Sequence, residues 1–115
     1  LFGLGICFDV RFQNDWQMLQ KQGALVCIVP GAFNLTTGPA HWELLFRARA
    51  VDNQLFMVGV SPARDLDFSY HAYGHSLVTD PWGSVLVQLG SEEGIAIVSV
   101  DLDRVASVRR QIPIL

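Results

Sequence analysis

Two short apolar runs, residues 24–29 and 54–60, constrain the fold most, because both are hydrophobic at nearly every position. Strands that are buried on both faces have this continuous pattern, whereas a strand with one solvated face alternates. A glycine-punctuated apolar run at residues 2–8 precedes them. Between the runs, residues 12–22 and 39–53 carry apolar side chains at helical spacing. This order of strands and helices favours parallel β-α-β units.

Glycine and proline mark the ends of these predicted elements. Gly23 stands where the first helix would need a C-terminal cap, and Pro39 suits the first position of the second helix. Farther along, residues 80–83 read D-P-W-G, a type I turn signature, between the predicted strands at 74–79 and 84–89. The sequence therefore predicts an antiparallel hairpin after the parallel units.

The end of the chain predicts one more strand at residues 95–100 and a closing helix at 102–111. Asp101 suits the helix cap, and Pro113 would end the helix. Parallel units joined to a hairpin indicate an α/β fold with a mixed sheet covered by helices.

Composition narrows the classes of function. The formal net charge is −3 and the eight Lys and Arg residues form no cluster, so nucleic acid is not an expected partner. No apolar run approaches the ~18 residues of a membrane span. Cys7 and Cys27 lie in apolar runs rather than at disulfide-framework spacing, which favours a reduced, cytosolic or organellar compartment.

Cys7 is the first candidate for chemistry. It lies at the end of the first predicted strand and shortly before a helix, and the partial positive charge of a helix N-terminus favours a thiolate. The backbone N–H of Phe8 would be free nearby to stabilise an oxyanion. From spacing alone, the favoured interpretation of Cys7 is a small buried hydrophobic residue with a structural role.

Several motifs, in order, resemble one family. They are G-I-C-F-D-V-R-F at residues 5–12, P-G-A-F-N-L-T-T-G-P-A-H-W-E-L-L at 30–45, R-A-R-A-V-D-N-Q at 47–54, S-P-A-R-D at 61–65, G-H-S-L-V-T-D-P-W-G at 74–83 and R-R-Q-I-P at 109–113. Together they resemble the nitrilase superfamily of carbon–nitrogen hydrolases, and within it the omega-amidases. The match departs mildly at Phe8, where tyrosine is common, and at Asn14-Asp15, where Pro-Glu is frequent.

The resemblance implies a four-layer α-β-β-α sandwich and a Glu-Lys-Cys catalytic set. Cys7 would be the nucleophile that forms a thioester and releases ammonia, while the Glu and Lys belong to the part of the family that precedes the cysteine. Residues 1–115 are then expected to be the C-terminal part of a single hydrolase domain, inactive alone. The start of the chain in mid-pattern and its end shortly after a proline agree with this.

For substrate binding, the resemblance points to Arg11 and Thr37 as groups that hold a distal carboxylate. A guanidinium pairs well with a carboxylate, and Thr37 precedes the helix that begins at Pro39. The alternatives are pairing of Arg11 with an aspartate (Asp9 or Asp15), and simple helix capping by Thr37. Phe33 would line the pocket, or serve only as a core aromatic.

We expect structural roles for the remaining polar residues. His41 and Glu43 begin the second helix and suit packing or subunit contact, while His75 and Ser76 suit hydrogen-bonded core positions. The three histidines have no metal-ligand spacing, so neither a metal nor another cofactor is expected. Cys27 lies inside a buried strand and is expected to be inert.

The expected enzyme is an amidase acting on omega-amides of 2-oxo dicarboxylic acids, such as 2-oxoglutaramate and 2-oxosuccinamate. The alternatives are an amidase for deaminated glutathione and a catalytically silent scaffold of the same fold. The resemblance also implies a homodimer formed through the helices near residues 12–22 and 40–53. A cytoplasmic location is expected, with a mitochondrial one as the alternative.

Overall fold

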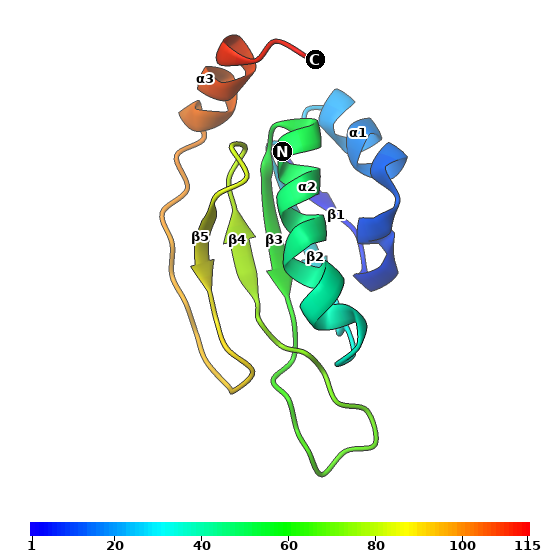
Figure 1. Ribbon diagram of the computed structural model, residues 1–115. Helices are drawn as coiled ribbons and strands as arrows, with labels where there is room; N and C mark the ends of the chain where they lie inside the picture. Colours follow the sequence, from blue (N-terminus) through cyan, green and yellow to red (C-terminus); the bar gives the residue numbers. More distant parts are fainter.

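The structure is a computed structural model that describes residues 1–115, and its centre is one five-stranded sheet in the order β1-β2-β3-β4-β5 (Figure 1). The strands are β1 (Phe2–Leu4), β2 (Val26–Pro30), β3 (Phe56–Val60), β4 (Leu77–Thr79) and β5 (Val85–Gln88). The helical elements are η1 (Cys7–Arg11), α1 (Gln13–Lys21), η2 (Gly38–Trp42), α2 (Glu43–Asn53) and α3 (Asp103–Gln111). Here η1 is a 3₁₀ helix and η2 a short π-helical segment that leads directly into α2.

The sheet is mixed, as the sequence predicts. Strands β1, β2 and β3 pair in parallel, with Cys27 opposite Gly3 on one side and Met57 on the other. Strands β4 and β5 then continue the sheet in antiparallel pairing. The carboxyl ends of the parallel strands therefore lie along one edge, where open α/β sheets place their ligands.

Helices α1 and α2 lie side by side against one face of the sheet (Figure 1). The strand side chains on that face include Cys27, Val29 and Met57, which pack in one apolar cluster with large buried side chains from the helices. Trp16 of α1 and Phe46 of α2 are almost completely buried there. Burial of rings this large contributes much of the hydrophobic stabilisation of a small domain.

The structure confirms the turns and the helix end that were predicted from glycine, proline and aspartate positions in the sequence. Gly23 follows α1 with a φ of +100°, the left-handed conformation that a helix C-terminal glycine adopts readily. In the hairpin between β4 and β5, the Gly83 N–H donates to the Asp80 carbonyl at 2.9 Å, which closes the predicted turn. Asp101 also acts near the start of α3, because its side chain accepts a hydrogen bond from the Asp103 N–H.

Two predictions about strands are wrong. Residues 95–100 form no strand and make no backbone–backbone hydrogen bond, and Ile95 and Ile97 are 93% and 95% exposed. The apolar alternation there is typical of a strand, but β5 ends the sheet and residues 95–100 add no further strand to it. The first run is also shorter than predicted: β1 ends at Leu4, and its outward side chains are exposed.

The second face of the sheet is largely open. Phe2 and Leu4 on β1 are 70% and 72% exposed, and Val60 of β3 is also exposed. Only a small cluster forms on this side, where Val105 of α3 packs against Val26 and Phe56. Helices α1 and α2 therefore cover one face, and the other, apart from this contact with α3, presents apolar side chains to solvent.

Candidate active site

Cys7 is the first residue of η1, three positions after the end of β1. Its φ is +48°, a left-handed conformation that is uncommon for a residue with a Cβ. Such strain costs of order 1–3 kcal/mol and is concentrated at functional sites. The thiol is free and half-buried, at the carboxyl edge of the parallel strands.

Gly31, just after β2, lies in close contact with the backbone of Cys7. A Cβ on Gly31 would lie 2.8 Å from the Cα of Cys7 and 3.3 Å from its Cβ. The glycine in the P-G-A-F motif therefore permits a close approach that a larger residue would block. The turn that carries Cys7 and the segment after β2 therefore pack closely through their main chains.

The N–H groups at the start of η1 lie beside the thiol. Phe8 is the second residue of η1, and the first N–H groups of a helix have no acceptor inside it. The Asp9 carboxylate turns back instead and accepts a hydrogen bond from the Ile6 N–H at 2.9 Å. The turn is thus closed by Asp9, and the role of the Phe8 N–H as an oxyanion donor stays a prediction.

Arg11 ends η1, and its guanidinium lies close to two aromatic rings. Its Cζ is 5.0 Å from the centroid of the Phe33 ring and 5.3 Å from that of the Phe8 ring. Both distances are within the range of cation–π attraction. The side chain is therefore held close to the turn that carries Cys7.

The hydrogen-bond partner of Arg11 is a residue that sequence reasoning missed. The Arg11 Nη2 lies 3.3 Å from the Nδ1 of His41, thirty residues away in η2. The alternative of pairing with Asp9 or Asp15 is wrong, since the only ion pair in the structure joins Arg49 and Asp52. The expectation that His41 would serve packing or subunit contact missed this bond, because nothing in its local sequence indicates Arg11.

Thr37 lies in the loop between Phe33 and His41, which both contact Arg11. Its hydroxyl donates to the Asn34 Oδ1 at 3.0 Å, and its N–H donates to the same oxygen at 2.7 Å. Thr37 occupies the position before η2, yet its side chain caps no helical N–H. The structure places Thr37 in the chain between two contacts of Arg11, Phe33 and His41, but shows no direct bond between Thr37 and Arg11.

Phe33 is a core aromatic that also faces Arg11. Its ring is only 5% exposed and contacts the Trp42 ring edge-to-face at 5.0 Å. Because the Arg11 Cζ also lies 5.0 Å from the centroid of this ring, Phe33 contacts both the core and the Arg11 guanidinium.

The long loop at residues 61–76 braces the Phe33 segment, a connection that the sequence did not reveal. The Tyr73 N–H donates to the Phe33 carbonyl at 2.7 Å, and the Tyr70 hydroxyl donates to the Ala32 carbonyl. The loop itself is held by the Arg64 guanidinium, which donates to the carbonyls of Ala72 and Tyr73.

Other candidates have structural roles. Cys27 is fully buried, and burial raises the pKa of its thiol to about 11, so it is protonated at neutral pH. Ser76 exchanges hydrogen bonds with the Ser61 backbone, and the His75 Nδ1 lies 2.8 Å from the Tyr73 carbonyl oxygen. Glu43 is exposed. No three side chains of His, Cys, Asp or Glu are grouped as metal ligands would be.

Comparison with known families agrees with this geometry. The family model described as carbon-nitrogen hydrolase matches residues 1–110, nearly the whole chain. The chain belongs to the carbon-nitrogen hydrolase family.

Relatives within the carbon-nitrogen hydrolases place it more closely. Mouse "Omega-amidase NIT2" is 58% identical over 113 residues, which cover 98% of this chain and 41% of the mouse protein. The crystal structure of Saccharomyces cerevisiae Nit3, a nitrilase-superfamily member, has a TM-score of 0.96 at 47% identity, covering 98% of this chain and 42% of Nit3. A mutant amidase from Nesterenkonia sp. AN1, with acrylamide added at its active-site cysteine, has a TM-score of 0.75 at 27% identity, covering 97% of this chain and 43% of the amidase. The chain thus spans less than half the length of these relatives.

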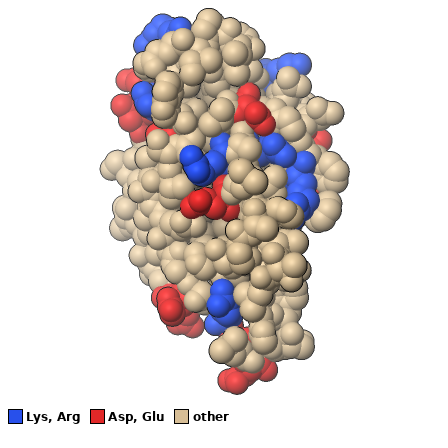
Figure 2. Space-filling model, viewed as in Figure 1, with Lys and Arg blue, Asp and Glu red and all other residues tan.

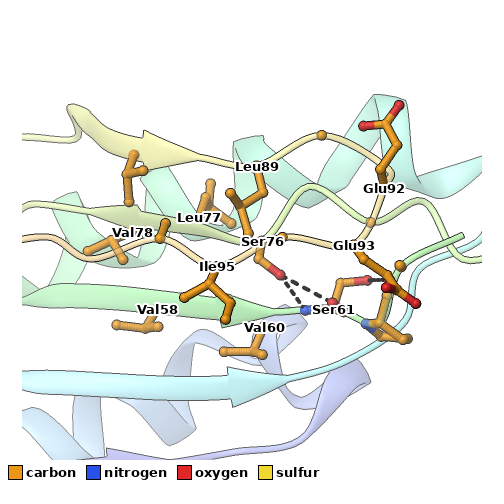
Figure 3. A pocket seen from close by; sticks show the side chains of 18 of the residues that line it. Val58, Val60, Ser61, Ser76, Leu77, Val78, Leu89, Glu92, Glu93 and Ile95 are labelled. Carbon is orange, nitrogen blue, oxygen red and sulfur yellow. Dashed lines mark hydrogen bonds between the residues drawn. The ribbon is translucent and has the colours of Figure 1, made fainter.

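A cavity of this carbon-nitrogen hydrolase chain lies away from Cys7. It measures about 440 Å³ and lies on the open face of the sheet, between β3, β4 and the segment that carries Ile95 (Figure 3). Its lining is mainly apolar, with Val58, Val60 and Leu89 among the side chains, and includes neither Cys7 nor Arg11. The cavity therefore belongs to the open sheet face rather than to the candidate active site.

Charge is spread thinly over the surface. On the face shown in Figure 2, basic and acidic groups lie near one another and most atoms are uncharged. None of the helices combines the length and apolar character that crossing a membrane requires.

Proposed function

We propose that the protein containing this chain is an omega-amidase that hydrolyses the side-chain amide of 2-oxo dicarboxylic acid omega-amides, such as 2-oxoglutaramate and 2-oxosuccinamate. The observation that carries the proposal is the pairing, within one short 3₁₀ helix, of a strained cysteine and an aromatic-flanked arginine. The 58% identity to mouse omega-amidase supports the same substrate class.

The spacing of Cys7 and Arg11 suits a substrate with an amide at one end and a carboxylate at the other. Four residues at the ~2 Å rise of a 3₁₀ helix separate their Cα atoms by roughly 8 Å along the axis. A short dicarboxylic chain fits between side chains at that separation. Thr37, on the loop beside Arg11, and the Phe33 ring would complete the carboxylate end of the pocket.

In the proposed reaction, the Cys7 thiolate attacks the amide carbonyl carbon, and the Phe8 N–H donates to the oxyanion. The C–N bond then breaks, and ammonia leaves after protonation by a general acid. Water hydrolyses the resulting thioester and regenerates the thiol. A glutamate and a lysine from the rest of the protein would serve as the general acid–base and as a second oxyanion donor, so residues 1–115 alone should be inactive.

The open face of the sheet suits a four-layer arrangement. Phe2, Leu4 and Val60 would be buried if a second sheet from the rest of the same protein packed on it. We also propose a homodimer through the outer surfaces of α1 and α2, where Met18, Leu44 and Val51 are exposed. We also propose a cytoplasmic location for the protein.

The test is ammonia release by the full-length protein from 2-oxoglutaramate and 2-oxosuccinamate. Replacement Cys7→Ala should abolish it, because no other nucleophile is present in the turn. The matched control is Cys27→Ala, which removes the buried second thiol and should retain activity. Full activity of the Cys7→Ala protein would exclude the proposed mechanism.

A further inference from the structure

The charge of Arg11 is left uncancelled although the side chain is held in place. Its guanidinium faces two aromatic rings and one imidazole nitrogen, and it has no carboxylate partner. An arginine that serves only structure usually meets a carboxylate or backbone carbonyl groups, as Arg49 does. The surroundings of Arg11 therefore fit a group kept available for an anion.

The direction of the hydrogen bond between Arg11 and His41 follows from the chemistry of the two groups. A guanidinium can only donate hydrogen bonds, so the Nδ1 of His41 must accept, and its proton lies on Nε2. The imidazole is then neutral. It orients the guanidinium and leaves its positive charge uncancelled. A carboxylate in the same place would cancel that charge.

His41 is also well anchored for this purpose. The next residue, Trp42, is fully buried, and its indole N–H donates to the His75 carbonyl at 2.8 Å. At the other end, the Arg49 guanidinium donates to the Arg11 carbonyl at 3.1 Å. Segment η2 and helix α2 thus hold both the main chain and the side chain of Arg11.

We propose that His41 is a positioning residue that holds the Arg11 guanidinium in the orientation that receives the distal carboxylate of the substrate. This rests on the proposed function. By fixing the guanidinium before the substrate arrives, His41 reduces the conformational entropy that Arg11 loses on binding. His41 therefore acts on carboxylate recognition through Arg11 and not on the amide chemistry at Cys7.

The experiment compares His41→Leu and His41→Asn in the full-length protein. Each is assayed with 2-oxoglutaramate and with a neutral primary amide of similar length, and the ratio of the two kcat/KM values is the readout. His41→Leu should lower that ratio about tenfold, mainly through a higher KM for 2-oxoglutaramate. In His41→Asn the amide oxygen can accept in place of Nδ1, so most of the ratio should return.

A matched control and a double variant separate positioning from general damage. His71→Leu removes a half-buried histidine whose Nε2 is 3.3 Å from the Leu66 carbonyl oxygen, and it should leave the ratio unchanged. In an Arg11→Met background, His41→Leu should cause no further fall, because its effect passes through Arg11.

Two outcomes overturn the inference while leaving the proposed function intact. One is an unchanged ratio in His41→Leu, whether both activities are kept or both fall by the same factor. The other is a further fall of the ratio when His41→Leu is added to Arg11→Met. If the unmodified protein cleaves no omega-amide, or if Cys7→Ala retains activity, the proposed function itself fails and the role of His41 fails with it.

Discussion

The Nη2 of Arg49 donates a hydrogen bond to the carbonyl oxygen of Arg11 at 3.1 Å, and its Nε donates to the Val10 carbonyl at 2.8 Å. One side chain of α2 thus satisfies two carbonyl groups at the C-terminal end of η1. Helix ends leave such carbonyls without partners inside the helix. The turn that carries Cys7 is therefore attached directly to the second helix.

Replacement Arg49→Met should lower the free energy of unfolding by about 2–3 kcal/mol, since it leaves these carbonyls without their charged donor. Activity should fall as well, because η1 would no longer be held in one position. Urea denaturation of the full-length protein measures the first effect. Arg110→Met, at an exposed site on α3, is the control and should change stability little. An Arg49→Met protein as stable as the control would contradict the role assigned to Arg49.

Replacement Gly31→Ala should lower kcat by about tenfold or more, because a shift of roughly 1 Å in a reacting group can cost even a hundredfold. The added Cβ would lie 2.8 Å from the Cα of Cys7, so the nucleophile turn must move. Steady-state kinetics of the full-length protein test this. In Gly94→Ala the added Cβ meets its nearest neighbour at an ordinary 3.6 Å, so that control should behave normally. Normal kcat in Gly31→Ala would show that the close contact is unimportant.

Burial of the Cys27 thiol predicts a loss of stability at alkaline pH. Because its folded-state pKa is raised from 9.0 to about 11, the protonated thiol favours the folded state. That contribution is fully present below pH 9 and is lost as the pH rises through about 11. Thermal unfolding measured between pH 8 and about 11 should show a smaller decline in Cys27→Ala than in the parent. Parallel curves for the two proteins would argue against this linkage.

Residues 1–115 expressed alone should self-associate and bind a hydrophobic dye, because Phe2 and Leu4 on the open face are exposed. Replacement Leu4→Lys should reduce the association by placing a charge in that face. The matched control is Leu66→Lys, on the loop at residues 61–76, where the exposed leucine lies away from the sheet. Light scattering checks both. A monodisperse monomer without dye binding would show that the open face needs no cover.

Local patterns were sufficient for much of the fold. The continuous apolar character of β2 and β3 indicated central parallel strands, and Asp80 and Gly83 specified the hairpin turn. These features depend on neighbouring residues, whose steric and hydrogen-bonding preferences act at short range. The same reasoning was wrong for residues 95–100, because a strand also needs a backbone partner, and sequence alternation does not provide one.

In the candidate site too, some features followed from the sequence and others only from the tertiary structure. The sequence by itself determined that Cys7 and Arg11 share one short segment and that Phe33 and Thr37 share one loop. Only the tertiary structure decided that Cys7 is strained at φ +48° against Gly31 and that His41 meets Arg11. The physical reason is distance along the chain: thirty residues separate Arg11 from His41, and only the parallel pairing of β1 with β2 brings their segments together.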